Sequence, residues 1–203
     1  MRQTAIFIER CVFIAPHKQM GIFTRRELAS SDGMLTTVWG PAMWHFLHTM
    51  SFNYPIAPTP EDKRHYGEFM RSLPGILPCK YCRENLAKTY KTNPPSEAHL
   101  ASRATFSRYV YDLHEKVNHL LKKKSNLSFA AVRERYEHFR ARCKPGPVDP
   151  KGPEKGCTEP LHRDAKARCV LRFVPQEDAC PTFDMDKRCK FTRKNKQKKK
   201  IAS

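Results

Sequence analysis

The sequence predicts an all-α fold, a four-helix bundle with a shorter fifth helix, confined to residues 35–143. Within that range apolar side chains recur at intervals of three and four, which places them on one face of an α-helix. Prolines and helix-capping residues divide the pattern into successive segments. The alternating pattern of a half-buried strand is absent. Four amphipathic helices and a short fifth bury a core of their own.

The sequence carries signals for where the first two helices begin and end. Residues 40–52 carry the first helical pattern, which stops before Pro55. The second begins at Thr59-Pro60, where a capping hydroxyl precedes proline and acidic residues follow at the positive end of the helix dipole. Because proline in a helix interior removes a backbone donor, we expect this helix to end at Pro74-Gly75.

The other three helices follow in order. The third opens at Pro78 and continues to Tyr90. The fourth, over residues 106–121, shows apolar spacings of three and four through four turns and is the strongest periodic signal in the chain. Ser128 then caps a fifth, whose aromatic and aliphatic side chains share one face as far as Phe139.

The flanking segments differ in composition. Residues 1–34 lack the unbroken apolar run of a secretory signal and are expected to form a flexible leader. Residues 144–203 hold seven of the 16 prolines, with 16 basic against eight acidic residues. Such a composition buries too little apolar surface to offset chain entropy, so we expect a disordered tail. No stretch reaches the roughly 18 consecutive apolar residues of a membrane-spanning helix.

Basic charge is concentrated near the end of the chain. The formal net charge is +18, and nine of the 14 residues from Lys187 to Lys200 are basic, with none acidic. Such a run suits nucleic acid or an anionic surface, and equally a solvated tail. No nucleic-acid-binding fold signature accompanies it. A non-enzymatic adaptor that binds through this run is therefore the alternative function class.

The chemistry lies in Cys79-Lys80-Tyr81-Cys82, a CxxC motif at a predicted helix N-terminus. The helix dipole and the neighbouring cations stabilise a thiolate there. A thiolate is the attacking species in disulfide exchange, so this placement predicts a redox-active pair.

Three other interpretations of the motif compete with this one. A structural zinc needs a second ligand pair, and the remaining cysteines, which stand at positions 11, 143, 157, 169, 180 and 189, provide none at a suitable spacing. A thioredoxin-like motif needs a βαβ context, which the helical flanks exclude. Two inert core thiols would leave the preceding proline and the cationic neighbours unexplained. No metal is predicted, and the redox disulfide is favoured.

Four motifs occur together in this chain. Residues 39–49 read WGPAMWHFLHT, residues 53–60 read NYPIAPTP, residues 77–83 read LPCKYCR and residues 113–123 read LHEKVNHLLKK. In this order and spacing they resemble the motifs of the Erv/ALR family of FAD-linked sulfhydryl oxidases. The residues of the first and third motifs are similar to those of members from large DNA viruses.

The resemblance implies a helical bundle that holds FAD noncovalently, usually as a homodimer. It implies the cofactor-binding residues Gly40, Trp44, His48, Tyr54, Cys82, Tyr109, His114, Val117, Asn118, Lys123 and Tyr136. Two positions depart from the family pattern, with Glu115 in place of Asn and Lys122 in place of Gly. A carboxylate beside a flavin diphosphate is unfavourable unless it points away, so the contact of Glu115 is in question.

The resemblance also implies a reaction. Protein substrate thiols would reduce the Cys79–Cys82 disulfide, and the electrons would pass from Cys82 through FAD to O2, releasing hydrogen peroxide. Family members often use a further cysteine pair on a flexible arm as a shuttle, for which Cys180 and Cys189 are the candidates here, against scattered thiols without catalytic duty. Viral relatives imply a host cytoplasmic assembly site or the virion, and cellular ones the mitochondrial intermembrane space.

Overall fold

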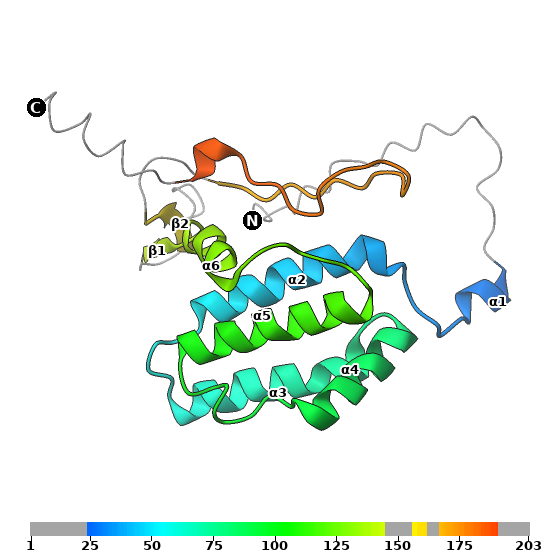
Figure 1. Ribbon diagram of the computed structural model, residues 1–203, viewed down its shortest axis with the longest axis horizontal. Coiled ribbons are helices and arrows are strands. Elements are labelled where there is room, and N and C mark those ends of the chain that lie inside the picture. Colours follow the sequence, from blue (N-terminus) through cyan, green and yellow to red (C-terminus); the bar gives the residue numbers. More distant parts are fainter. Residues whose placement is uncertain (1–23, 145–155, 162–166, 191–203) are drawn as a thin grey trace, which may run out of the picture.

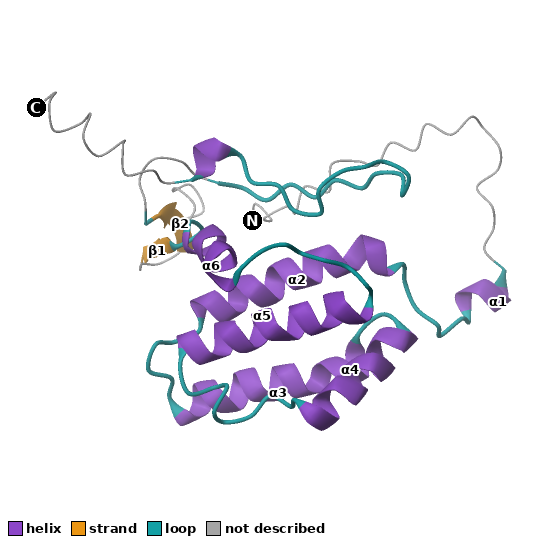
Figure 2. Cartoon of the chain, viewed as in Figure 1, coloured by secondary structure: helices purple, strands orange, loops and turns teal. Residues whose placement is uncertain are grey.

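The computed structural model describes residues 24–144, 156–161 and 167–190. Its helices are α1 (Arg25–Leu28), α2 (Thr36–Asn53), α3 (Pro60–Ile76), α4 (Lys80–Thr92), α5 (Arg103–Leu120) and α6 (Phe129–Glu137). Two strands, β1 (Ala141–Lys144) and β2 (Gly156–Pro160), and a 3-10 turn, η1 (Lys187–Cys189), follow. The five predicted helices are confirmed as α2 to α6, and the fold class with them (Figure 2).

The bundle consists of α2 against α5 and α3 against α4, with α6 across one end of α2 (Figure 1). One apolar cluster joins all four long helices, and its buried members are Leu47, Tyr54, Met70, Leu73, Leu86, Leu100, Phe106, Tyr109, Val110 and Leu113. A second, smaller cluster of Phe52, Val132 and Tyr136 fixes α6 on α2. Burial of this kind supplies most of the helical stability.

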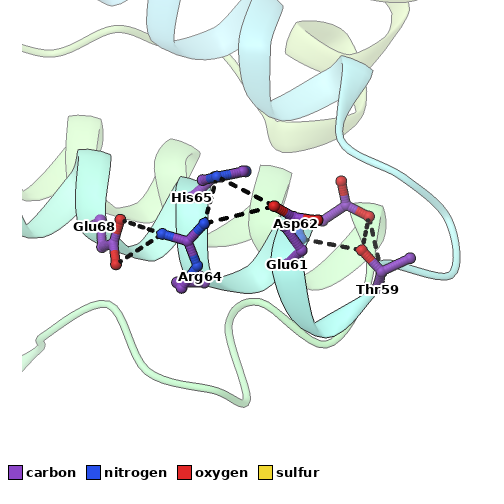
Figure 3. Close-up of polar contacts among 6 residues, drawn as sticks. All are labelled: Thr59, Glu61, Asp62, Arg64, His65 and Glu68. Atoms are coloured by element: carbon purple, nitrogen blue, oxygen red, sulfur yellow. Dashed lines mark hydrogen bonds and ion pairs between the residues drawn. The ribbon is translucent and has the colours of Figure 1, made fainter.

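The start of α3 shows how a local signal fixes an element. Thr59 Oγ1 accepts a hydrogen bond from Asp62 N at 3.1 Å, and Asp62 Oδ2 accepts one from Thr59 N at 2.8 Å (Figure 3). This reciprocal capping box satisfies two backbone donors that the helix leaves free. The other end differs from the prediction, because α3 continues through Pro74 to Ile76. Proline is tolerated there since only the last turn follows it.

Helix α5 ends in a Schellman motif. Lys123 N donates to Asn118 O at 2.8 Å and Lys122 N donates to His119 O at 3.0 Å. The motif needs one left-handed residue, and Lys122 takes that role with φ +55°. Lys122 is the position at which the resemblance expects glycine, and glycine adopts this conformation without a steric penalty.

The expectation that no strand is present is wrong after α6. Strands β1 and β2 pair antiparallel, and a disulfide joins Cys143 to Cys157 across them. Strands of four and five residues are too short to show alternation, and their partnership depends on a connection between distant residues. Within the described ranges, no helix is long and apolar enough to cross a membrane.

Candidate active site

The CxxC motif begins helix α4, as predicted. Cys79 is the N-cap residue, and its Sγ accepts a hydrogen bond from Cys82 N at 3.2 Å. The sulfur therefore occupies the position of a capping oxygen, at the positive end of the helix dipole. Both thiols are half-buried, and neither is joined in a disulfide in the structure.

A short strap formed by residues 32–34 holds the motif from the other side. Lys80 N donates to Asp32 O at 2.8 Å, and Met34 N donates to Pro78 O at 2.7 Å. Between these two bonds Gly33 forms a β-bridge with Cys79. Gly33 has φ +128°, and a Cβ atom there would lie 2.5 Å from Pro78 O, so only glycine fits. The strap belongs to the segment expected to be a flexible leader.

The two thiols have opposite pKa shifts. Burial raises the pKa of Cys79, but hydrogen bonds from Cys82, Thr36 and the Tyr81 backbone outweigh it, and its pKa lies below the ordinary value. The pKa of Cys82 is raised, first by burial and then by its hydrogen bond to Cys79. Thr36 Oγ1 lies 3.7 Å from Cys82 Sγ, within hydrogen-bond distance for sulfur. The reduced pair therefore holds its thiolate at Cys79 and its proton at Cys82.

A histidine–aromatic cluster lies between α2, α5 and α6, and consists of Trp44, His45, His48, His114 and Tyr136. The rings of Trp44 and His114 are stacked, with centroids 3.9 Å apart and planes 5° from parallel. His48 Nε2 and His114 Nδ1 share a hydrogen bond of 3.0 Å, while His45 Nδ1 and Tyr136 Oη lie 3.3 Å apart. Three helices thus contribute planar rings to one cluster.

Two histidines of the cluster, His48 and His114, are neutral near pH 7. Burial lowers the pKa of His48 to about 3, with further lowering by His114 and His45. Burial also lowers the pKa of His114 to about 4. His48 is only 4% exposed, and its Nδ1 is buried without a hydrogen-bond partner. An unpaired buried polar atom is costly in a folded protein, and a ligand that pairs with it removes that cost.

A cavity of about 100 Å³ opens at this cluster and is lined by Trp44, His45, His48 and Tyr136, among others. A larger open groove of about 1040 Å³ lies along α4 and α5, where Asn93, Tyr109 and Glu115 line it. The larger groove contains neither a cysteine nor a member of the histidine–aromatic cluster. The small cavity is therefore the better candidate for part of a cofactor site, because its lining includes the neutral His48, whose Nδ1 is unpaired.

The structure brings together four of the predicted cofactor residues, namely Trp44, His48, His114 and Tyr136. Gly40 is buried on the same helix, one turn from Trp44, and a Cβ atom there would meet only Thr36 Cγ2, at 3.5 Å. Cys82 lies beside that same Thr36.

Two predicted residues lie in the helical core. Tyr54 is fully buried and its hydroxyl donates to Leu100 O at 2.9 Å. Tyr109 is 2% exposed, donates to Asn93 O at 3.1 Å and stacks on His99. Backbone carbonyls thus already satisfy both hydroxyls. A role in contacting the cofactor stays a prediction for these tyrosines.

The remaining predicted residues lie on or after the second half of α5. Val117 and Asn118 are half-buried, and Lys123 is exposed beyond the helix end. Asn118 Nδ2 donates to Glu115 Oε1 at 3.1 Å, and Glu115 lines the larger groove. The carboxylate that departs from the family pattern therefore lines the larger groove, while its charge raises the pKa of the neighbouring His114 against the larger effect of burial.

The structure adds residues that the sequence did not single out. Thr36 lies beside the redox pair, and His45 belongs to the cluster although the motif predicts a cofactor role only for its neighbours Trp44 and His48. Phe183 contacts the same cluster from the tail. Neither Thr36 nor Phe183 carries a sequence signal, because each acts through an approach between distant segments.

The tail cysteines differ in their pairing. Cys180 is exposed, Cys189 is half-buried, and both are free. Cys143 and Cys157, for which the sequence predicts no pairing, form the disulfide between β1 and β2. Most of the basic run at Lys187–Lys200 lies outside the described residues. In the part of the chain that the structure describes, no group of three His, Cys, Asp or Glu side chains is placed to hold a metal.

Comparison with known proteins gives a consistent result. The model of the Erv1 / Alr family matches residues 41–137. A protein of Acanthamoeba polyphaga mimivirus, named as a probable FAD-linked sulfhydryl oxidase, is 38% identical over 86 residues. A protein of Invertebrate iridescent virus 6 named for the same activity is 30% identical over 90 residues, and the match covers 42% of this chain and 81% of that one. The FAD-linked sulfhydryl oxidase ERV1 of Arabidopsis thaliana is 34% identical over 84 residues.

The matches are partial in length. The mimivirus match covers 42% of this chain and 60% of its relative, and the Arabidopsis match covers 41% and 42%. A solved structure, the yeast Erv1 core, is 23% identical and covers 60% of this chain and 93% of its own, with a TM-score of 0.46.

Proposed function

The chain belongs to the Erv1 / Alr family, and from that premise we propose that it is a thiol oxidase that binds FAD and forms disulfide bonds in protein substrates. One observation carries the proposal. A CxxC pair with its thiolate at a helix N-cap occurs in one bundle with a buried cluster of planar rings that contains an unpaired nitrogen. The first feature exchanges disulfides, and the second suits a planar cofactor.

The residues present fit one ring of a flavin dinucleotide. His48, whose buried Nδ1 lacks a hydrogen-bond partner, lines the small cavity together with Trp44 and Tyr136. Because their mutual hydrogen bond occupies one nitrogen of each ring, the neutral pair His48 and His114 offers one further donor and one further acceptor. Trp44, His48, His114 and Tyr136 would hold FAD, which supplies a two-electron acceptor for the dithiol and a donor to O2.

The protein side of the reaction is a pair of disulfide exchanges. A substrate thiolate attacks Cys79 Sγ of the oxidised pair, the Cys79–Cys82 bond breaks, and Cys82 leaves with the electron pair. The raised pKa of Cys82 then holds that sulfur as a protonated thiol. A second substrate thiolate attacks the substrate sulfur of the mixed disulfide. Cys79 leaves as a thiolate, which its lowered pKa makes a good leaving group. The products are a substrate disulfide and the reduced pair.

Replacing Cys82 tests the proposal directly. The purified chain should be yellow and should consume oxygen when a dithiol is added. Cys82→Ser should retain the flavin absorbance and lose oxygen consumption, while Cys169→Ser, which alters a free and exposed thiol, should keep both. A colourless wild-type protein, or a Cys82→Ser variant that oxidises dithiothreitol normally, contradicts the assignment.

We extend the proposal to a homodimer formed through the outer face of α2 and α3. Phe46 is 51% exposed on α2 and makes an edge-to-face contact with Phe69 of α3, while Val38 on α2 is 47% exposed. Exposed large apolar side chains on adjoining helices are typical of a subunit interface. A second copy of this chain would cover them.

Two further parts of the proposal rest on sequence alone. Cys180 and Cys189 are proposed to shuttle electrons from substrates to the Cys79–Cys82 pair; their joint replacement by serine should slow oxidation of protein dithiols but not of dithiothreitol. A viral assembly site and the mitochondrial intermembrane space both stay predictions for location. A relative from Saccharomyces cerevisiae is named as mitochondrial, and others come from viruses.

The adaptor alternative has its own signature. A colourless protein that binds DNA with a strong dependence on salt would favour the basic tail as the functional element.

A further inference from the structure

One side chain of the tail is docked against the bundle. Phe183 is half-buried, whereas the other phenylalanine in the described part of the tail, Phe173, is 56% exposed. Val170 and Leu171 are also exposed, at 67% and 63%. The position of Phe183 is therefore not a general collapse of apolar side chains onto the domain.

The ring of Phe183 is fixed from three sides. Its centroid lies 5.6 Å from that of His45 and 6.2 Å from that of Tyr136, with interplanar angles of 35° and 30°. The guanidinium of Arg135 lies 5.6 Å from the ring centre, within range of a cation–π interaction. Residues of α2 and α6 thus hold this ring, and Figure 1 shows the tail passing beside α6.

Phe183 lines a cavity instead of filling it. With the tail in place, a partly open space of about 100 Å³ is lined by Thr182 and Phe183 of the tail together with Trp44, His48 and Tyr136 of the bundle. The unpaired Nδ1 belongs to His48, one of these walls. The tail therefore shares a cavity with the residues that fit the cofactor.

The ring that this cavity suits is not the redox-active one. The redox ring must reach Cys82, and neither Cys82 nor its neighbour Thr36 lines the cavity. A dinucleotide carries a second planar ring, a purine, whose edge both donates and accepts hydrogen bonds. A neutral histidine with an unpaired nitrogen and aromatic walls match that chemistry.

We propose that Phe183 is a cofactor-binding residue, a wall contributed by the tail that closes over the purine half of the dinucleotide. The inference rests on the proposed function, since it specifies how the tail takes part in the same site. Stacking on an aromatic ring strengthens binding of a base by roughly fivefold or more. Removing the wall should therefore weaken binding of ligands that carry the purine and leave a flavin mononucleotide unaffected.

The test compares full-length Phe183→Ala with wild type, using Phe173→Ala as the matched control. Dissociation constants are measured for FAD, for FMN and for ADP by flavin fluorescence and by calorimetry. We expect Phe183→Ala to raise the dissociation constants of FAD and ADP at least fivefold and to leave that of FMN within twofold. Phe173→Ala should match wild type, and Phe183→Trp should restore tight FAD binding. Protease cleavage between residues 180 and 189 should slow when FAD is added to wild type only.

The outcomes separate the two claims. If wild type and Phe183→Ala bind FAD equally well, this inference is overturned and the proposed function is left intact. Tighter FAD binding by Phe183→Ala also overturns it, because the tail would then compete with the cofactor. A parallel loss of FMN binding would show that the variant disturbs the whole site, and it too counts against a purine wall. Wild type that binds no flavin overturns both.

Discussion

Lys122 has a backbone conformation that destabilises the fold. It occupies the left-handed position of the Schellman motif at the end of α5, with φ +55°. A residue with a Cβ atom is strained there by roughly 1–2 kcal/mol, and glycine is not. The backbone hydrogen bonds of the motif form despite that cost.

We predict that Lys122→Gly stabilises the protein by about 1 kcal/mol, part of the relieved strain being offset by the greater freedom of glycine in the unfolded chain. Urea unfolding followed by circular dichroism measures the change. Lys124→Gly, two residues along the chain and also exposed, should be neutral or destabilising. A decrease in stability for Lys122→Gly would contradict the role of strain.

Thr36 is predicted to adjust the reactivity of the CxxC pair. Burial raises the pKa of both thiols, and the hydrogen bond of Thr36 lowers both. Thr36→Val should therefore raise both pKa values and slow alkylation of the reduced pair near neutral pH, where the rate follows the thiolate fraction. The rate is measured as a function of pH. Thr37→Val, which alters the exposed neighbour, should leave the profile unchanged.

The neutral histidines make the flavin-free protein sensitive to acid. The pKa of His48 is lowered to about 3 and that of His114 to about 4 in the folded state, while both return to about 6.5 on unfolding. The unfolded chain binds more protons between those values, so stability is complete above pH 6.5 and falls as the pH drops toward 4. The fall is at most about 1.4 kcal/mol per pH unit for each histidine.

Thermal unfolding across that pH range measures the effect. His114→Gln should reduce the slope, since one titrating group is removed, and His65→Gln, on the exposed face of α3, should not. Equal slopes in wild type and His114→Gln would refute the assignment of a buried neutral His114.

Among the elements, the long helices could be predicted because their signals are local. The hydroxyl of Thr59 followed by Pro60 correctly predicts the start of α3, since a capping box involves only residues three apart in the sequence. The end of α3 was placed too early, because whether a proline stops a helix depends on how much helix follows it.

The strands and the strap could not be predicted for the opposite reason. Cys143 and Cys157 meet because β1 and β2 pair, and Gly33 meets Cys79 because the segment before α2 lies against the start of α4. In the candidate site, the sequence identified Trp44 and His48 through motif spacing. The sequence did not indicate the contact of Phe183 with the cluster, since a contact between distant segments produces no periodic pattern of apolar residues.

The chain combines a high positive charge with an exposed apolar face on α2 and α3. At a net charge of +18, two copies repel each other, so a dimer must be held by apolar burial. Phe46→Glu should therefore convert a dimer to a monomer, as light scattering after gel filtration would show, while Ile56→Glu, at an exposed loop position, should not. A wild-type protein that is monomeric at low and high salt would refute the α2–α3 interface.

The bridge between Gly33 and Cys79 has a consequence for how the chain tolerates shortening. The helical pattern alone places the catalytic unit at residues 35–143, yet Asp32 and Met34 hold the backbone of Lys80 and Pro78. Proteolytic trimming that stops before Asp32 would leave the reactive pair anchored. A cut only three residues further on would leave every helix of the bundle intact. It would nevertheless remove the strap that holds the backbone around Cys79.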